Sequence, residues 1–216
     1  MLFIPFHVIS FLQSFAMDGV DRFPTLNEML DSFPTLDKKL EALRVCPPQV
    51  IEHLVKTEIP QDLLPLQYLE SLSNEERTIC YRTAMICWTV TGLTMVPREM
   101  QFRVVLSDVQ RQDCLIATGT GSGKTLPIAL SILLDDPAAD FITITISPLK
   151  RLQVTQESDF RSRFQIPTVT INDDTDRSIE WWKAVECRLS LQFSLKFVVR
   201  YRSWQGKGCC RRWVGG

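Results

Sequence analysis

One glycine-rich stretch constrains this chain more than any other part of its sequence: Thr118-Gly119-Thr120-Gly121-Ser122-Gly123-Lys124-Thr125. Its three alternating glycines allow the backbone to curl, so that successive N–H groups point at one place and form a nest for phosphate oxygens. The apolar stretch that follows has helical character, and the positive N-terminal end of a helix attracts anions. We therefore predict a P-loop, in which Lys124 contacts the β- and γ-phosphates of a nucleotide and the Thr125 hydroxyl binds Mg²⁺.

The stretch departs from the strict pattern G-x-x-x-x-G-K-[ST] at its first position, where Thr118 replaces glycine. Its context supports the prediction, because an apolar run over 113–118 has the character of a buried strand and the residues from Gly123 to about Leu134 have that of a helix. The alternative is a glycine-rich turn that binds nothing.

Short β-branched segments alternate with helical segments after Pro97. Strands are expected over 113–118, 141–146 and 167–171, and helices over 98–110, 123–134 and from Ser147-Pro148 to about Phe160. Helices of this length between short strands are typical of parallel α/β units. The fold class is therefore predicted to be α/β.

The residues before Pro97 are expected to form a helical N-terminal region. A ten-residue repeat, DRFPTLNEML followed by DSFPTLDKKL, predicts either short helical turns or a linear peptide motif. Thr25 with Glu28, and Ser73 with Glu76, have the spacing of capping boxes at helix starts. The second of these is expected to open a helix that runs to about Val90 and ends at Gly92.

Several of these blocks together resemble the opening of a DEAD/DEAH-type (superfamily-two) helicase, nearest to the RecQ-like branch. They are Pro97-Arg98-Glu99-Met100-Gln101, the run from Arg111 to Ala117, and the glycine-rich stretch itself. The resemblance implies a partial RecA-like parallel sheet with ATP and Mg²⁺ as ligands. It also implies that Gln101, 23 residues before Lys124, holds the adenine edge, for which an amide that donates and accepts is suited.

A further block, Ile146 to Gln156, resembles the motif with which these helicases hold the phosphates of one nucleic-acid strand. The implied contacts are Ser147, Pro148, Leu149, Lys150 and Arg151. Ser147 is expected to cap the following helix and direct its N-terminus at a phosphate, while the two basic side chains add charge attraction. The implied partner is single-stranded or duplex DNA, and RNA stays open. An ordinary capped helix with solvated basic residues is the alternative.

The acidic motif of this helicase class, an Asp-Glu pair at the end of an apolar strand, does not occur in the sequence. In the family its Asp holds Mg²⁺ through water and its Glu activates the attacking water. Asp135-Asp136 follows a helix, and Asp173-Asp174 follows a strand too early in the chain. No catalytic residue is therefore assigned, and we expect a lobe that ends before the Asp-Glu motif and is inactive alone.

Residues 188–216 differ from the rest of the chain, because they carry seven basic and no acidic side chains. Residues 1–187 then hold 17 basic against 25 acidic residues, a net charge of −8. We expect three parts: a helical region over 1–96, a partial helicase ATP-binding domain over 97–187, and a basic tail over 188–216 that is disordered or non-native. The seven cysteines have no regular spacing, which favours a reducing, intracellular compartment, and the resemblance points to the nucleus.

Two other functions stay open. A small P-loop kinase shares the loop, although no lid arginine or acceptor site is recognisable. Alternatively, residues 18–96 are a helical module that docks a protein partner, and the P-loop is vestigial.

Overall fold

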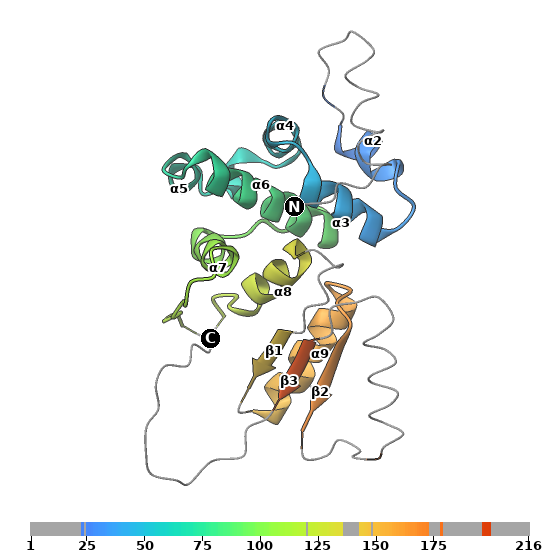
Figure 1. The fold of residues 1–216 in the computed structure, drawn as a ribbon, viewed down its shortest axis with the longest axis vertical. Helices are drawn as coiled ribbons and strands as arrows, with labels where there is room; N and C mark the ends of the chain where they lie inside the picture. The colour runs from blue at the N-terminus through green and yellow to red at the C-terminus, as the bar shows by residue number, and fades with distance from the viewer. Residues whose placement is uncertain are drawn as a thin grey trace. The chain divides into compact units, whose positions relative to one another are not determined.

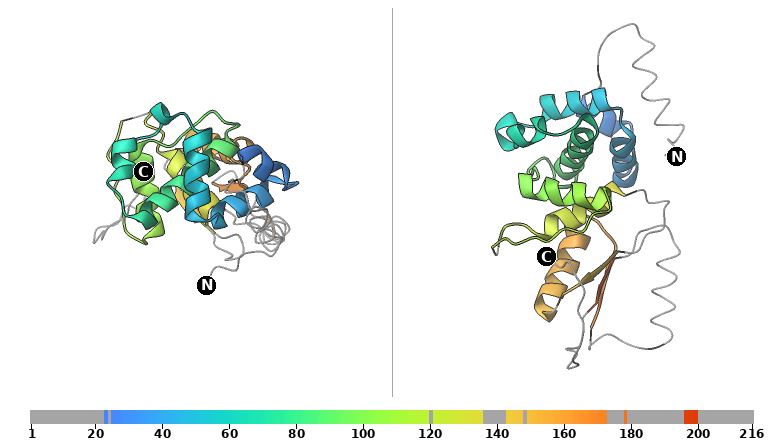
Figure 2. Two further views of the ribbon diagram at one scale, coloured as in Figure 1. Left: turned by 90° about the horizontal axis from the view of Figure 1, so that it is seen from above. Right: turned by 60° about the vertical axis from the view of Figure 1, so that its left-hand side comes forward.

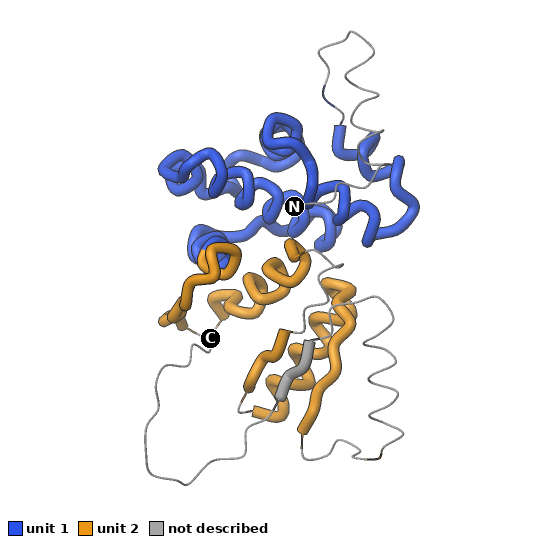
Figure 3. Tube along the Cα trace, in the orientation of Figure 1, with its two compact units in different colours: residues 1–106 blue, residues 107–216 orange. Residues whose placement is uncertain are grey.

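The computed structural model describes residues 23, 25–119, 121–135, 143–147, 149–172, 178 and 196–199 of the 216. The chain divides into two compact units, Met1–Leu106 and Ser107–Gly216 (Figure 3). The sequence predicts a boundary between Val96 and Pro97, whereas this division falls within helix α7 (Glu99–Val109). Each unit is described below by itself.

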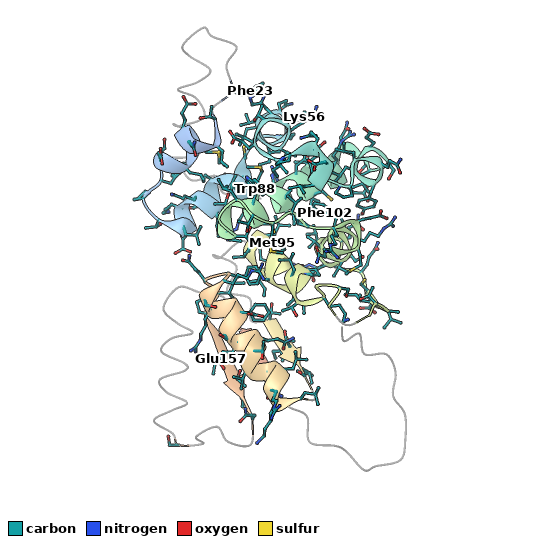
Figure 4. The ribbon with its side chains drawn as sticks, turned by 180° about the vertical axis from the view of Figure 1, so that it is seen from behind. Phe23, Lys56, Trp88, Met95, Phe102 and Glu157 are labelled. Carbon is teal, nitrogen blue, oxygen red and sulfur yellow. The ribbon has the colours of Figure 1, made fainter. Side chains whose placement is uncertain are left out.

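The first unit is helical, and its central element is α6 (Asn74–Val90) (Figure 1). Helices α3 (Leu36–Val45), α4 (Pro48–Glu58) and α5 (Leu66–Glu70) all pack against α6. The fully buried side chains that fill the space between the helices include Leu43, Ile51, Leu54, Met85, Ile86 and Phe102. Figure 4 labels Phe102 on α7 and Trp88 on α6. The short helices α2 (Leu26–Asp31) and η1 (Gln61–Leu63) complete the described part of this unit.

Both predicted capping boxes are confirmed. The Thr25 hydroxyl accepts the backbone N–H of Glu28, whose carboxylate accepts the N–H of Thr25, and α2 begins there. Ser73 and Glu76 make the same reciprocal contacts at the start of α6. The second copy of the repeat uses Thr35 in the same way, because its hydroxyl accepts the Lys38 N–H at the start of α3. Each copy of the repeat is therefore a helix start, which confirms the helical interpretation.

Helix α6 ends at Val90, and Gly92, the glycine predicted at its end, follows the C-cap residue with a φ of +63° in the left-handed region. The N–H of Gly92 donates to the carbonyl of Thr89, and the N–H of Leu93 donates to that of Trp88. These two bonds form a Schellman motif. Along α6, Thr83 and Ile86 are buried, whereas Ile79 and Val90, which follow the same helical spacing, are only partly so.

The second unit contains a three-stranded parallel sheet in the order β1-β3-β2. Its strands are β1 (Thr143–Ile146), β2 (Thr168–Ile171) and β3 (Lys196–Val199), and Thr143 and Thr168 both align with Lys196. Helix α9 (Lys150–Ser162) packs against β2, and the right-hand view of Figure 2 shows it along one face of the sheet. Helix α8 (Thr125–Leu134) follows the glycine-rich stretch.

The strand predicted over 113–118 is wrong: these residues are not in a strand, and the middle strand of the sheet is β3 instead. Leu115 is 77% exposed, so the apolar run has no buried setting, and a strand exists only where neighbours complete its backbone hydrogen bonds. The α/β character is thus present, but no strand among the described residues leads into the P-loop, so the RecA-like sheet is not confirmed. Of the basic tail over 188–216, only β3 is described, and the expected nature of the remainder lies outside the described residues.

Other features of the described residues bear on cofactors and surroundings. Cys46, Cys80, Cys87 and Cys114 form no disulfide, and no group of three or more His, Cys, Asp or Glu side chains that could hold a metal occurs among the described residues. None of the described helices combines the length and the apolar character needed to cross a membrane.

Candidate nucleotide-binding site

The backbone of the glycine-rich stretch explains both its glycines and its departure from the strict pattern. Gly121 and Gly123 have φ angles of +82° and +80°, which L-residues with side chains adopt only at a cost. Thr118 is not among the described residues with positive φ. Glycine is therefore conformationally required at Gly121 and Gly123 but not at Thr118, and the replacement leaves the curl of the loop intact. Thr120 lies outside the described residues.

The side chain of Lys124 folds across the loop. Its Nζ donates to the carbonyl oxygens of Thr118 at 3.0 Å and of Gly119 at 2.8 Å. An ammonium group has three donors, so two hold the charge beside the loop while a third remains for a phosphate oxygen. The loop is also closed by the Ser122 N–H, which donates to the Gly119 carbonyl at 3.4 Å.

The N-terminus of α8 adds a second source of positive potential. Thr125 is the first residue of the helix and Lys124 precedes it as the N-cap, with no side-chain hydrogen bond to cap the first turn. Uncapped N–H groups at a helix start attract anions. Thr125 is half-buried and directly follows Lys124, and its role as the Mg²⁺ ligand stays a prediction. These residues fit a nucleotide with its magnesium ion.

The surroundings of the loop are open on the side that a larger side chain would occupy. A Cβ built on Gly119 or on Gly121 would meet nothing within 4 Å. Packing against the protein therefore does not explain glycine at Gly119, which also lacks a positive φ. A glycine there leaves the backbone open to close approach by a ligand.

Gln101, predicted to hold adenine, lies in the first turn of α7 and belongs to the first unit, whereas the P-loop belongs to the second. Its side chain is 4% exposed, and its Oε1 accepts the backbone N–H of Arg98 at 2.8 Å. This is the glutamine half of a capping box, so Gln101 has a role in starting α7. Its role toward adenine stays a prediction.

The turn before α9 differs from expectation in one respect. Ser147 does not cap the helix: the N-cap is Leu149, which makes no side-chain cap, and the buried Ser147 hydroxyl has no hydrogen-bond partner. Leu149 and Arg151 are exposed, and Lys150 is partly so. Pro148 lies outside the described residues. The capping role fails because the helix begins at Lys150, two residues later than a cap at Ser147 requires, so Leu149 holds the N-cap position.

Two interactions in these regions were not expected from the sequence. Gln153, fully buried on α9, donates through Nε2 to the Ser147 carbonyl at 2.7 Å and so fixes the turn before the helix. The sequence could have indicated that Gln153 is buried, because Gln153, Gln156 and Phe160 have helical spacing and all three are buried on α9. In the P-loop, the hydroxyls of Thr118 and Ser122 lie 2.8 Å apart.

A comparison with protein families adds to this geometry. Residues 98–191 match the DEAD/DEAH box helicase family. The match contains the P-loop and the turn before α9, so the two predicted ligand-binding regions fall within one helicase-like segment. Comparisons with curated proteins and with solved structures found no match.

Proposed function

We propose that this chain contains the ATP-binding and nucleic-acid-binding lobe of a RecQ-like DNA helicase. The observation that carries the proposal is the P-loop: two left-handed glycines, a lysine across the loop and an uncapped helix start lie within one turn. Such a turn presents backbone N–H groups, an ammonium and a helix terminus to one anion. The match to DEAD/DEAH box helicases over residues 98–191 supports ATP as that anion.

The RecQ-like part of the proposal is supported by the order of the sequence blocks around the P-loop. Gln101 precedes Lys124 by 23 residues, and the Ile146–Gln156 block follows the next predicted strand. The resemblance to the RecQ-like branch favours DNA as the nucleic acid and the nucleus as the location of the protein.

ATP binding is tested with Lys124→Ala. Equilibrium titration with a fluorescent ATP analogue should show a loss of affinity of about tenfold or more, the order of magnitude for a lost charged contact. The matched control is Lys56→Ala, because Lys56 is an exposed lysine of α4 that forms a salt bridge with its helix neighbour Glu52 and lies outside the P-loop. Equal affinities of wild type and Lys124→Ala would show that nucleotide does not bind at the loop.

Nucleic-acid binding is proposed for the exposed start of α9. The first turn of α9 has no side-chain cap, and Lys150 and Arg151 stand there. A phosphate would meet the positive N-terminal end of α9 and two positive charges, whereas Ser147 is too buried to contribute its hydroxyl.

Single-stranded DNA should therefore bind weakly, with a shallow dependence of log affinity on log salt that reflects about one to three phosphates. The double variant Lys150→Ala, Arg151→Ala should lower both affinity and slope. The control Lys38→Ala, Lys56→Ala removes two exposed lysines of α3 and α4. A steep slope that disappears on deletion of residues 200–216, which leaves β3 intact, would assign binding to the basic tail instead.

A further inference from the structure

The P-loop contains a hydroxyl pair that its sequence pattern does not require. The Thr118 Oγ1 lies 2.8 Å from the Ser122 Oγ, and these residues stand at the beginning and near the end of the loop. The strict pattern has glycine at the first position, which carries no hydroxyl. Thr118, which replaces that glycine, therefore supplies a contact that the strict pattern does not contain.

The hydroxyl contact spans the same part of the loop as the other contacts within it. Ser122 stands between Gly121 and Gly123, the two left-handed residues, and its N–H already donates to the Gly119 carbonyl. Lys124 bonds the carbonyls of Thr118 and Gly119. Threonine is stiff about χ1 because it is branched at Cβ, so its hydroxyl is held in place at little entropic cost.

We propose that the Thr118–Ser122 hydroxyl pair braces the P-loop in its curled conformation, which makes Thr118 a positioning residue for the phosphates of the nucleotide. Two flexible glycines leave the loop many alternative conformations, and each must be given up when phosphates bind. A bond between its two ends removes some of them in advance, and pre-organisation of this kind raises affinity without contact to the ligand. This inference rests on the proposed function of the loop as a nucleotide site.

The brace predicts how four variants bind an ATP analogue. Thr118→Val keeps the shape of the side chain and removes its hydroxyl, and Ser122→Ala removes the other member of the pair. Each should weaken binding of an ATP analogue by about two- to fivefold, the effect of one exposed neutral hydrogen bond. The double variant should bind no worse than either single variant, because both remove the same bond. Thr118→Ser, which retains a hydroxyl, should bind like the wild type.

Hydrogen–deuterium exchange provides a readout that needs no nucleotide. In the ligand-free protein, the amides of residues 119–124 should exchange faster in Thr118→Val and Ser122→Ala than in the wild type and Thr118→Ser. The exchange of α6 should be the same in all of them, because that helix lies in the first unit. A general loss of stability would instead accelerate exchange in the whole second unit.

The outcomes separate the brace from the function on which it rests. If Lys124→Ala weakens ATP binding but Thr118→Val binds and exchanges like the wild type, the nucleotide site stands and the brace is overturned. Losses that multiply in the double variant, or a Thr118→Ser variant that behaves like valine, also overturn the brace. If the wild type itself binds no ATP analogue, the proposed function is overturned and the positioning role with it, whatever the exchange data show.

Discussion

The side-chain oxygen of Gln101 accepts the backbone N–H of Arg98 at 2.8 Å, in the first turn of α7. The residue that the helicase resemblance assigns to adenine is thus also a helix-capping residue. One atom, Oε1, does the capping, while adenine recognition needs the amide to donate as well as to accept. The two roles can be separated by substitution.

Gln101→Glu keeps the capping oxygen and removes the amide donor. A carboxylate in the first turn of a helix is favoured by the helix dipole, but a side chain that is 4% exposed must also be desolvated, so the melting temperature should fall modestly. Preference for ATP over GTP, measured by competition, should fall. Gln101→Ala should lose the preference and also about 1 kcal/mol of stability, because the cap is gone. A Glu variant that still prefers ATP as the wild type does would remove Gln101 from the adenine site.

Gly119 and Gly121 should respond differently to alanine. Gly119→Ala is accommodated by the protein, since its Cβ meets nothing within 4 Å and its φ is not positive. The melting temperature should not change, and any loss of ATP affinity then reports contact between ligand and backbone. Gly121→Ala imposes the φ of +82° on a residue with a side chain and should lower stability by about 1 kcal/mol. Thermal unfolding and ATP titration of both variants check this, and an unstable Gly119→Ala would contradict it.

The chain should not hydrolyse ATP at the rate of a working helicase. The sequence has no Asp-Glu pair, so no positioned carboxylate acts on the attacking water. Phosphate release with saturating single-stranded DNA should stay well below about 1 s⁻¹, near the low end for working enzymes. The phosphate release of the Lys124→Ala variant gives the background rate of the assay. Turnover at or above that rate that disappears in Asp173→Ala or Asp174→Ala, two residues outside the described part, would refute the prediction.

Alkaline pH should destabilise the first unit through two buried thiols. Burial raises the pKa of Cys46 to about 12, against a smaller opposing effect of Arg82, and burial with the nearby Glu76 raises that of Cys80 to about 12. The ordinary value is 9.0. The unfolded chain therefore loses these protons first, so stability is fully present below about pH 9 and falls as the pH rises toward 12.

Thermal unfolding from pH 7 to pH 10 measures this effect. Burial also raises the pKa of Tyr68 and Tyr81 from 10.0, so the interval from pH 9 to pH 10 reports mainly on the thiols. Cys80→Ala should reduce the pH slope in that interval whatever its effect on stability at neutral pH. An unchanged slope would show that the Cys80 thiol does not contribute.

Local interactions made much of this structure predictable. The capping boxes at Thr25 and Ser73, the end of α6 at Gly92 and the curl of the P-loop each depend on residues within a few positions of one another. The strands were harder to predict, because a strand depends on pairing partners that lie far away in the sequence. The run over 113–118 has strand character but no place in the sheet, and β3 was not expected. In the candidate site, the Thr118–Ser122 contact depends on side-chain rotamers that no pattern specifies.

The middle position of β3 has a consequence for the order of folding during synthesis. β1 and β2 each pair with β3, and Thr143 is 53 residues and Thr168 28 residues from their common partner Lys196. The ribosome must therefore release residue 199 before either strand can complete its ladder, while the helices of the first unit, built from nearby contacts, assemble earlier. During that interval β1 would present Ile144 and Ile146 on an unpaired strand. An unpaired strand with exposed apolar side chains favours aggregation, so the newly made chain needs protection until β3 has been released.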